Sequence, residues 1–227
     1  MSAHLQREIE KLKKKILALS AVVEESVRRS IRSVEERDSA LAERVIKTDV
    51  EIDQSEIDVE EECLKILALH QPVAIDLRFI VAVLKINNDL ERIGDMATNI
   101  AERALFFNTQ NQFEIPFGLR GMAEKAQAML RHALDALVNL NSMLALAVCA
   151  ADDEVDDLFR AMFDQVVAEI QKNPGDAEAL INLLSVSRYL ERIADHATNI
   201  AEDVIYMIEG AIVRHGAKDF KPQSAQQ

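Results

Sequence analysis

The sequence predicts an all-α protein of six long helices, arranged as two tandem three-helix bundles. The 227 residues include only 6 Gly and 4 Pro, with 49% hydrophobic and 4% aromatic side chains, a composition typical of a helical chain with few turns. In addition, the segment 90–102 recurs at 190–202 with differences only at Gly94/Ala194 and Met96/His196. Such a recurrence indicates a tandem duplication, so each half is expected to form one bundle.

The positions of the six helices follow from the apolar periodicity and from the residues that interrupt it. Pro72, Pro116 and Pro174 fall at expected boundaries, because proline cannot continue a helix. Asp38 and Asn141 are the expected N-caps of the second and fifth helices, and Pro72 suits the entrance of the third. Short connections between antiparallel neighbours would give three helices per bundle and a pseudo-twofold axis between bundles. The predicted helices lie at about 3–36, 39–70, 73–108, 117–138, 142–172 and 176–214.

The domain boundaries follow from the same pattern. Residues 109–120 contain several Asn, Gln, Pro and Gly residues and are predicted to form the linker between the bundles. The first bundle is then 1–108, the second is 121–214, and 215–227 form a polar tail. A homodimer is the favoured oligomeric state, because exposed faces of long helices often pair.

Composition and charge exclude several functional classes. A formal net charge of -13 argues against nucleic-acid binding, which needs clustered Lys and Arg. The basic run at 11–15 is interpreted as the solvated face of a helix. Cys63 and Cys149 match no metal-binding or redox spacing and are interpreted as reduced core thiols. The N-terminus has no apolar signal region, and Asn residues interrupt the most apolar stretch, 136–151, so a cytoplasmic protein without membrane insertion is expected.

Acidic residues form stripes at helical spacing in both halves. On a helix that advances 100° per residue, Glu91, Asp95, Thr98 and Glu102 fall within about 60° of one another, opposite an apolar side. Acids four residues apart repel each other, so their repetition at equivalent places indicates that a cation binds between them. The predicted metal ligands are Asp49, Asp53, Glu91, Asp95, Asn99 and Glu102 in the first half, and Asp152, Asp156, Glu191, Asp195, Asn199 and Glu202 in the second.

The arrangement of these acids predicts one polynuclear metal site per bundle. If the second and third helices pack side by side, Asp49 and Asp53 would meet Glu91 and Asp95 across a groove, and the second half would repeat this. Oxygen ligands favour Mg²⁺, Mn²⁺, Ca²⁺ or iron over zinc, which thiolate and imidazole hold.

Other polar residues near the stripes have simpler interpretations. Thr98 and Thr198 are interpreted as caps of backbone carbonyls, and His196 as a packed or surface histidine. Arg92 and Arg192 are interpreted as ion-pair partners or supporting groups of the acids. Solvated surface acids are expected at Glu56, Glu60, Asp153, Glu154 and Asp157.

The chain resembles the PhoU family of phosphate-system accessory proteins. The resemblance rests on the repeated segments 90–102 and 190–202 and on Gln71-Pro-Val-Ala-Ile-Asp-Leu-Arg78, and it covers essentially the whole chain. It implies a cytoplasmic six-helix protein whose acid-x-x-x-Asp motifs bind polynuclear metal, with iron preferred and manganese, magnesium or zinc as alternatives. It also implies a negative regulator of the phosphate-starvation response that contacts the ATPase component of the phosphate ABC transporter and a sensor histidine kinase.

The element 71–78 has no counterpart in the second half, where the chain continues after Asn173-Pro-Gly-Asp176. Asp76 and Arg78 are interpreted as an ion pair at the entrance of the third helix.

Two other functions remain open from the residues alone. A metal-free helical scaffold would leave the acids solvated. A carboxylate-bridged di-iron enzyme would need Glu-x-x-His on helices that face the core, whereas positions 94 and 194, three after the motif glutamates, are Gly and Ala. The sequence therefore favours a non-enzymatic, metal-binding adaptor.

Overall fold

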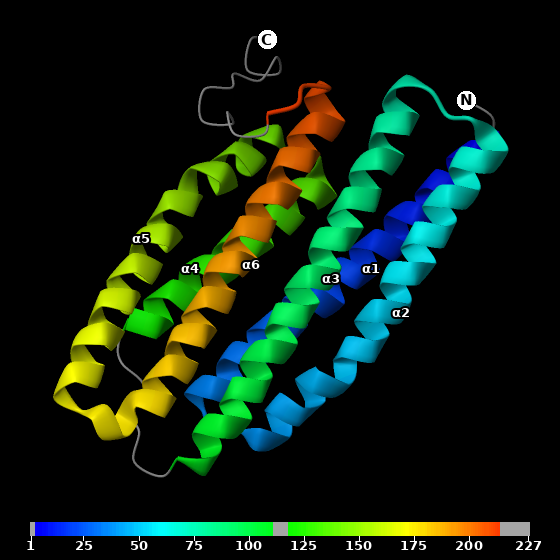
Figure 1. Ribbon diagram of the computed structural model, residues 1–227. Coiled ribbons are helices and arrows are strands. Elements are labelled where there is room, and N and C mark those ends of the chain that lie inside the picture. The colour runs from blue at the N-terminus through cyan, green and yellow to red at the C-terminus, as the bar shows by residue number, and fades with distance from the viewer. Residues whose placement is uncertain (1–2, 111–117, 214–227) are drawn as a thin grey trace.

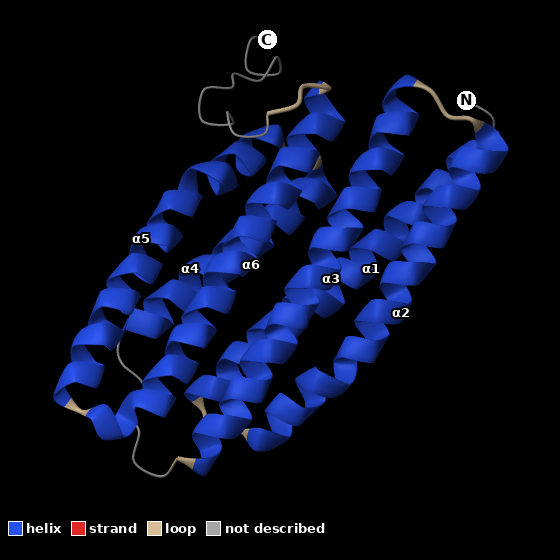
Figure 2. Ribbon diagram, in the orientation of Figure 1, coloured by secondary structure: helices blue, strands red, loops and turns tan. Residues whose placement is uncertain are grey.

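The computed structural model describes residues 3–110 and 118–213, and the regular elements there are helices (Figures 1 and 2). Six of them are α-helices and a seventh is a single 3₁₀ turn, η1 (Pro174–Asp176). The α-helices are α1 (Ala3–Glu35), α2 (Ser39–His70), α3 (Ala74–Thr109), α4 (Gly118–Asn139), α5 (Ser142–Lys172) and α6 (Ala177–Glu209). The predicted all-α fold with six long helices is confirmed.

Local capping explains where α2 and α5 begin and where α6 ends. The carboxylate of Asp38 accepts a hydrogen bond from the backbone N–H of Leu41, and Asn141 caps α5 in the same way, so both predicted N-caps are confirmed. The predicted end of the last helix at 214 is wrong, because Gly210 adopts a left-handed conformation at φ 73° and terminates α6 after Glu209.

The predicted domain boundaries are only partly covered by the described residues. Residues 118–120, which were assigned to the linker, belong to the first turn of α4. The rest of the predicted linker, apart from 109–110, and the polar tail 215–227 lie outside the described residues. The exact limits of the two bundles stay a prediction.

The helices pack in two layers (Figure 1). One layer contains α2, α3, α6 and α5 side by side, and α1 and α4 lie behind it. Within the first half, α1, α2 and α3 contact one another, and α4, α5 and α6 do the same in the second half. The apolar faces form one continuous core that runs through both halves and includes Ile52, Ile93, Val155 and Ile193. This arrangement places the α2–α3 pair and the α5–α6 pair at the two sides of the front layer.

A buried carboxylate ties α1 to α2. Glu62 is only 6% exposed, and its oxygens contact Lys11 at 2.8 Å, Lys65 at 3.1 Å and Lys15 at 3.5 Å. Burial alone would raise the pKa of Glu62, but the hydrogen bonds from the lysines outweigh it and lower the pKa to about 2. Lys11 and Lys15 are still accessible to solvent, as expected for the run 11–15, but they also pair with this buried acid.

The two halves meet along α3 and α6, which run antiparallel in the middle of the front layer. Lys85 donates to Asp203 at 2.8 Å, and its ammonium group lies 5.2 Å from the centre of the Tyr206 ring. Nearby, Nδ1 of His196 lies 2.7 Å from Oδ1 of Asp89, with both side chains largely buried. The interpretation of His196 as a packed histidine agrees with this contact, and its replacement of Met96 creates a polar link between the bundles.

The buried thiols and the helix hydropathy match the sequence expectations. Cys63 and Cys149 are buried and make no disulfide. In the described residues, no helix has a stretch that is both apolar enough and long enough to cross a lipid bilayer.

Candidate metal centre

The first acidic groove lies between α2 and α3. Thr98 donates a hydrogen bond from Oγ1 to Oδ1 of Asp49 at 3.0 Å, which brings the two stripes together across the helix pair. Glu91 is half-buried, and Asp53 and Asp95 are exposed at the groove. The second and third helices pack side by side as expected, and the contact that an acid makes across them is with a threonine. The interpretation of Thr98 as a backbone cap is wrong, because its hydroxyl binds a carboxylate of the other helix.

The second groove, between α5 and α6, repeats this geometry. Thr198 donates to Oδ1 of Asp152 at 3.2 Å, so its interpretation as a backbone cap is wrong as well. Next to this contact, carboxylate oxygens of Asp156, Glu191 and Asp195 all lie within 4.8 Å of one another. Among the described residues this is the one group of three or more acids, histidines or cysteines that approaches so closely. One candidate cation site is therefore present in the second half.

In the described structure, the carboxylates of Asp53, Glu91 and Asp95, the equivalent acids of the first groove, do not all come within 4.8 Å of one another. The sequence predicted equal sites in the two halves, whereas the observed grooves differ in how closely their carboxylates converge. A first-half site would require the side chains of these acids to move together around a bound ion.

Burial, together with repulsion between neighbouring acids, raises the pKa values of several carboxyls in both grooves. For Asp49 the causes are burial first, and then the charges of Asp53, Asp95 and Glu102. For Asp195 burial is again the largest cause, followed by the charges of Asp152 and Asp156.

Burial, followed by neighbouring acids, also raises the pKa of Glu91 and of Glu191. In the case of Glu91 the acids are Asp95, Glu56 and Asp53, so acids from both helices of the first groove act on one carboxyl. The charges of Arg92 beside Glu91, and of Arg188 and Arg192 beside Glu191, offset only part of this effect. In the second groove Arg160 also pairs with Asp156 at 3.5 Å.

The outer glutamates of the stripes also lie near the grooves. Burial raises the pKa of the Cys149 thiol to about 12, with additional contributions from the charges of Glu202 and Asp152. In the first groove, the charge of Glu102 contributes to the raised pKa of Asp49. Glu102 and Glu202 thus mark one end of each groove, beyond the threonine contact.

The two asparagines that were predicted as ligands use their amide groups elsewhere. Asn99 donates to the backbone oxygen of Asp95 at 2.7 Å. Asn199 donates to Oδ1 of Asp89 at 3.3 Å and so belongs to the contact between the halves. Their amide oxygens are the atoms that a metal would need, and a ligand role for Asn99 and Asn199 stays a prediction.

The acids that were interpreted as solvated have mixed environments. Asp157 pairs with Arg160 at 2.7 Å and Glu154 pairs with Lys125, as expected of surface residues. Glu56 differs, because it is half-buried and burial, together with the charges of Glu60 and Asp53, raises its pKa. The interpretation of Glu56 as a freely solvated acid is wrong.

The entrance of α3 lacks the predicted ion pair. Asp76 and Arg78 make no hydrogen bond or ion pair with each other in the described structure, and Nε of Arg78 is enclosed without an acceptor. Instead, Arg78 packs against the end of α6, where a Cβ added to Gly210 would lie 3.4 Å from Cζ of Arg78. This arginine therefore connects the start of α3 to the end of α6.

Comparison with known proteins explains why the two grooves repeat. Residues 16–104 and 119–204 each match the PhoU domain, and together they cover most of the chain. The chain belongs to the PhoU family. The two matches coincide with α1–α3 and α4–α6, so the internal repeat is a tandem pair of PhoU domains.

The relatives of this PhoU-family chain agree in sequence and in fold. It is 37% identical over 218 residues to the phosphate-specific transport system accessory protein PhoU homolog of Pseudomonas putida, which covers 95% of this chain and 84% of that protein. The crystal structure of PhoU from Pseudomonas aeruginosa superposes with a TM-score of 0.87 at 37% identity, covering 91% of this chain and 99% of that one.

A second solved relative, the phosphate transport system regulatory protein PhoU from Streptococcus pneumoniae, has a TM-score of 0.84 at 27% identity. It covers 92% of this chain and 99% of that one. The resemblance that the motifs suggested is confirmed.

Proposed function

We propose that this chain is a metal-binding cytoplasmic adaptor that negatively regulates the phosphate-starvation response and phosphate uptake. Family membership supports the link to phosphate, because the curated relatives are named as accessory proteins of the phosphate-specific transport system. The proposed partners are the ATPase component of the phosphate ABC transporter and its sensor histidine kinase. Through these contacts, the adaptor would relay phosphate status from the transporter to the kinase.

The observation that carries the metal part of the proposal is the convergence of Asp156, Glu191 and Asp195 within 4.8 Å. Three carboxylates in one groove supply the oxygen ligands that hard cations prefer. Since burial, followed by the charges of neighbouring acids, raises the pKa values of Glu191 and Asp195, a bound cation would stabilise the charged forms. Iron is the preferred ion, and manganese, magnesium and zinc are the alternatives.

The position of the acids favours an adaptor over a di-iron enzyme. Di-iron carboxylate enzymes place Glu and Glu-x-x-His ligands in the core of a helix bundle. Here the acids line grooves at the surface, and His196 is engaged by Asp89 at the contact between the halves. An ion in such a groove is accessible to a partner protein rather than enclosed around a small substrate.

A complementation experiment tests the adaptor role. In a strain that lacks the chromosomal copy, a phosphate-starvation reporter is expected to stay on in high phosphate and to be silenced by the wild-type chain. The ATPase component and the sensor kinase should co-purify with the chain. A chain that accumulates normally but neither silences the reporter nor retains either partner would overturn the proposal.

The same assay separates the metal from the adaptor role. The variant Asp156→Asn/Asp195→Asn removes two ligands of the second groove, and Asp135→Asn changes an exposed acid on α4 as a matched control. Loss of silencing in the double variant alone would show that regulation depends on the groove. Normal silencing in both variants would restrict the metal to a stabilising role.

A further inference from the structure

The contact between the halves has a defined antiparallel register. Lys85 of α3 pairs with Asp203 of α6, and four residues further along α3, Asp89 pairs with Asn199, four residues earlier in α6. Extending this register along the same two helices places Asn99 level with Tyr189, and Arg103 level with Ser185. The α3–α6 contact thus has two ends, one marked by Lys85 and Asp203 and the other by Arg103 and Ser185. Residues at one end correspond in the internal repeat to residues at the other.

One end of the contact is acidic and internally paired. A hollow there is lined from α3 by Lys85, Asn88 and Asp89, and from α6 by Asn199 and Asp203, with Glu202 at its edge. Its single lysine is bound to Asp203. Asp89 accepts from Asn199 and contacts His196.

The repeat replaces these side chains with cationic and neutral donors at the other end. At an offset of 100 residues, Arg188 takes the place of Asn88, Tyr189 that of Asp89, and Arg103 that of Asp203. Asn99 and Asn199 are identical, so the amide is present at both ends. Ser185 replaces Lys85, and Glu102 keeps the place of Glu202. The other end therefore carries two guanidinium groups, a phenol and an amide beside one remaining carboxylate.

The two arginines and the tyrosine at this end have no hydrogen-bond partner among the described residues. Arg103 is half-buried, and its Nε is enclosed without an acceptor. Enclosing a guanidinium N–H without an acceptor costs free energy, and a nearby anion recovers part of it. Arg188 is exposed and makes no ion pair, although its charge offsets part of the rise in the pKa of Glu191 on the next turn of α6.

We propose that the surface around Arg103, Arg188 and Tyr189 binds a tetrahedral oxyanion of the phosphate class. Guanidinium groups present paired N–H donors that match phosphate oxygens, and a tyrosine hydroxyl adds a further donor. This site goes beyond the metal grooves and the proposed adaptor role, because it lies on the α3–α6 contact. The predicted metal ligands Asn99 and Glu102 are its neighbours, and the proposed anion donors are other residues.

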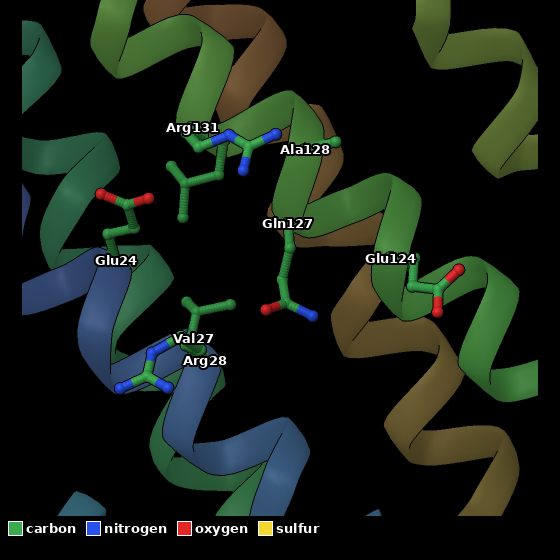
Figure 3. Close-up of a pocket in the computed structure, with 8 residues that line it drawn as sticks. Glu24, Val27, Arg28, Glu124, Gln127, Ala128 and Arg131 are labelled. Carbon is green, nitrogen blue, oxygen red and sulfur yellow. The ribbon is translucent and has the colours of Figure 1, made fainter.

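A comparison within the molecule supports this choice. The hollow between α1 and α4 also contains two arginines, Arg28 and Arg131 (Figure 3). There, however, Arg28 is held by Glu25 at 2.6 Å, and Glu24 and Glu124 line the same hollow. Its charges are balanced from within, so an anion gains little by binding.

Isothermal titration of metal-free protein with orthophosphate at constant ionic strength tests the proposal. We expect binding by the wild type and a dissociation constant raised about tenfold or more in Arg103→Gln and in Arg188→Gln. Arg131→Gln is the matched control and should bind like the wild type. A parallel titration with AMP distinguishes free phosphate from a phosphoryl group carried on a larger molecule.

The outcomes decide the proposal without reference to the adaptor role. Failure of the wild type to bind either orthophosphate or AMP would overturn it. Binding that is unchanged in both arginine variants would also overturn it, because the anion would then occupy another surface. If Arg103→Gln unfolds by circular dichroism, the exposed Arg188→Gln decides alone.

Discussion

Thr98 and Asp49 are joined across the first acidic groove, where the threonine hydroxyl donates to the carboxylate at 3.0 Å. The same contact recurs between Thr198 and Asp152 at 3.2 Å. The repeated threonine therefore orients an acid of the neighbouring helix. This contact gives a physical reason for its retention in both halves.

Replacing the threonines should weaken metal binding without unfolding the protein. Thr98→Val/Thr198→Val keeps the side-chain shape but removes both hydroxyl donors. Loss of such an orienting hydrogen bond is expected to lower metal affinity about tenfold. Manganese titration of the metal-free variant, followed by paramagnetic resonance of the free ion, measures the change. Thr48→Val on α2 is the control, since its hydroxyl donates to the Arg44 backbone oxygen and not to an acid.

The raised pKa of Asp195 predicts how the metal-free protein responds to pH. A carboxyl whose pKa is higher in the folded than in the unfolded state holds its proton better when folded. Its stabilising contribution is therefore full at low pH and is lost as the pH rises from about 3.8 through the raised value.

Metal-free Asp195→Asn should accordingly be more stable than the wild type at pH 7. Because solvent screens these charges, the free energy of unfolding should rise by only about 0.5 kcal/mol, which corresponds to about 1–2 °C in Tm. The difference should shrink towards pH 4, and Asp135→Asn should show no such trend. Thermal melts in EDTA measure this, and a variant that is less stable than the wild type by equal amounts at both pH values would contradict the electrostatic account.

The difference between Gly94 and Ala194 is matched on the neighbouring helix. A Cβ added to Gly94 would lie 3.1 Å from Cγ2 and Cδ1 of Ile52. At the equivalent place in the second half, Ala194 is accompanied by Val155, which is one methylene smaller. Each half thus combines one small and one large residue at the closest approach of its helices.

This pairing predicts strong coupling between the two positions. Gly94→Ala alone should cost about 1–3 kcal/mol through overpacking, offset by about 1 kcal/mol of helix propensity. Ile52→Val alone should cost about 0.5–1.5 kcal/mol. The double variant has the same pair of residues as the second half. Its loss in free energy of unfolding, measured by urea denaturation, should be smaller than the sum of the two single losses by at least about 0.5 kcal/mol. Additive effects would show that the two side chains do not compete for the same space.

Glu62 predicts the opposite pH dependence from Asp195. Its pKa is lowered to about 2 from the ordinary value of 4.5. Its contribution to the free energy of unfolding is therefore present above pH 4.5 and is lost as the pH falls towards 2. Glu62→Gln should lower the free energy of unfolding by about 2–3 kcal/mol at pH 7, because three lysines lose their buried partner. Urea denaturation should show this loss shrinking in acid. The exposed neighbour Glu61→Gln is the control, and equal effects of both variants would argue against the buried network.

Much of the fold could be predicted from the sequence, because single-helix patterns determine it. The apolar period, the prolines and the N-caps Asp38 and Asn141 placed the helix boundaries within a few residues, except at the end of α6. There the sequence after Gly210 stays apolar, and only the left-handed conformation of that glycine ends the helix.

The parts that sequence reasoning missed depend on contacts between helices. The threonine contacts to Asp49 and Asp152, and the link between Asp89 and His196, join residues at least 46 positions apart. Arg78 likewise packs on Gly210 rather than on its neighbour Asp76. The repeat itself held one usable signal, because Thr98 and Thr198 recur with the acids and so belong with them.

The most direct test of the central claim is the metal content of untagged protein, measured by plasma mass spectrometry. The wild type and Asp135→Asn should contain iron or another metal, while Asp156→Asn/Asp195→Asn should lose the ion of the second groove. The corresponding variant of the first groove, Asp53→Asn/Asp95→Asn, should retain that ion. If the wild type and all variants contain no metal, even after reloading with iron or manganese, the acidic grooves do not bind metal. That result would contradict the account.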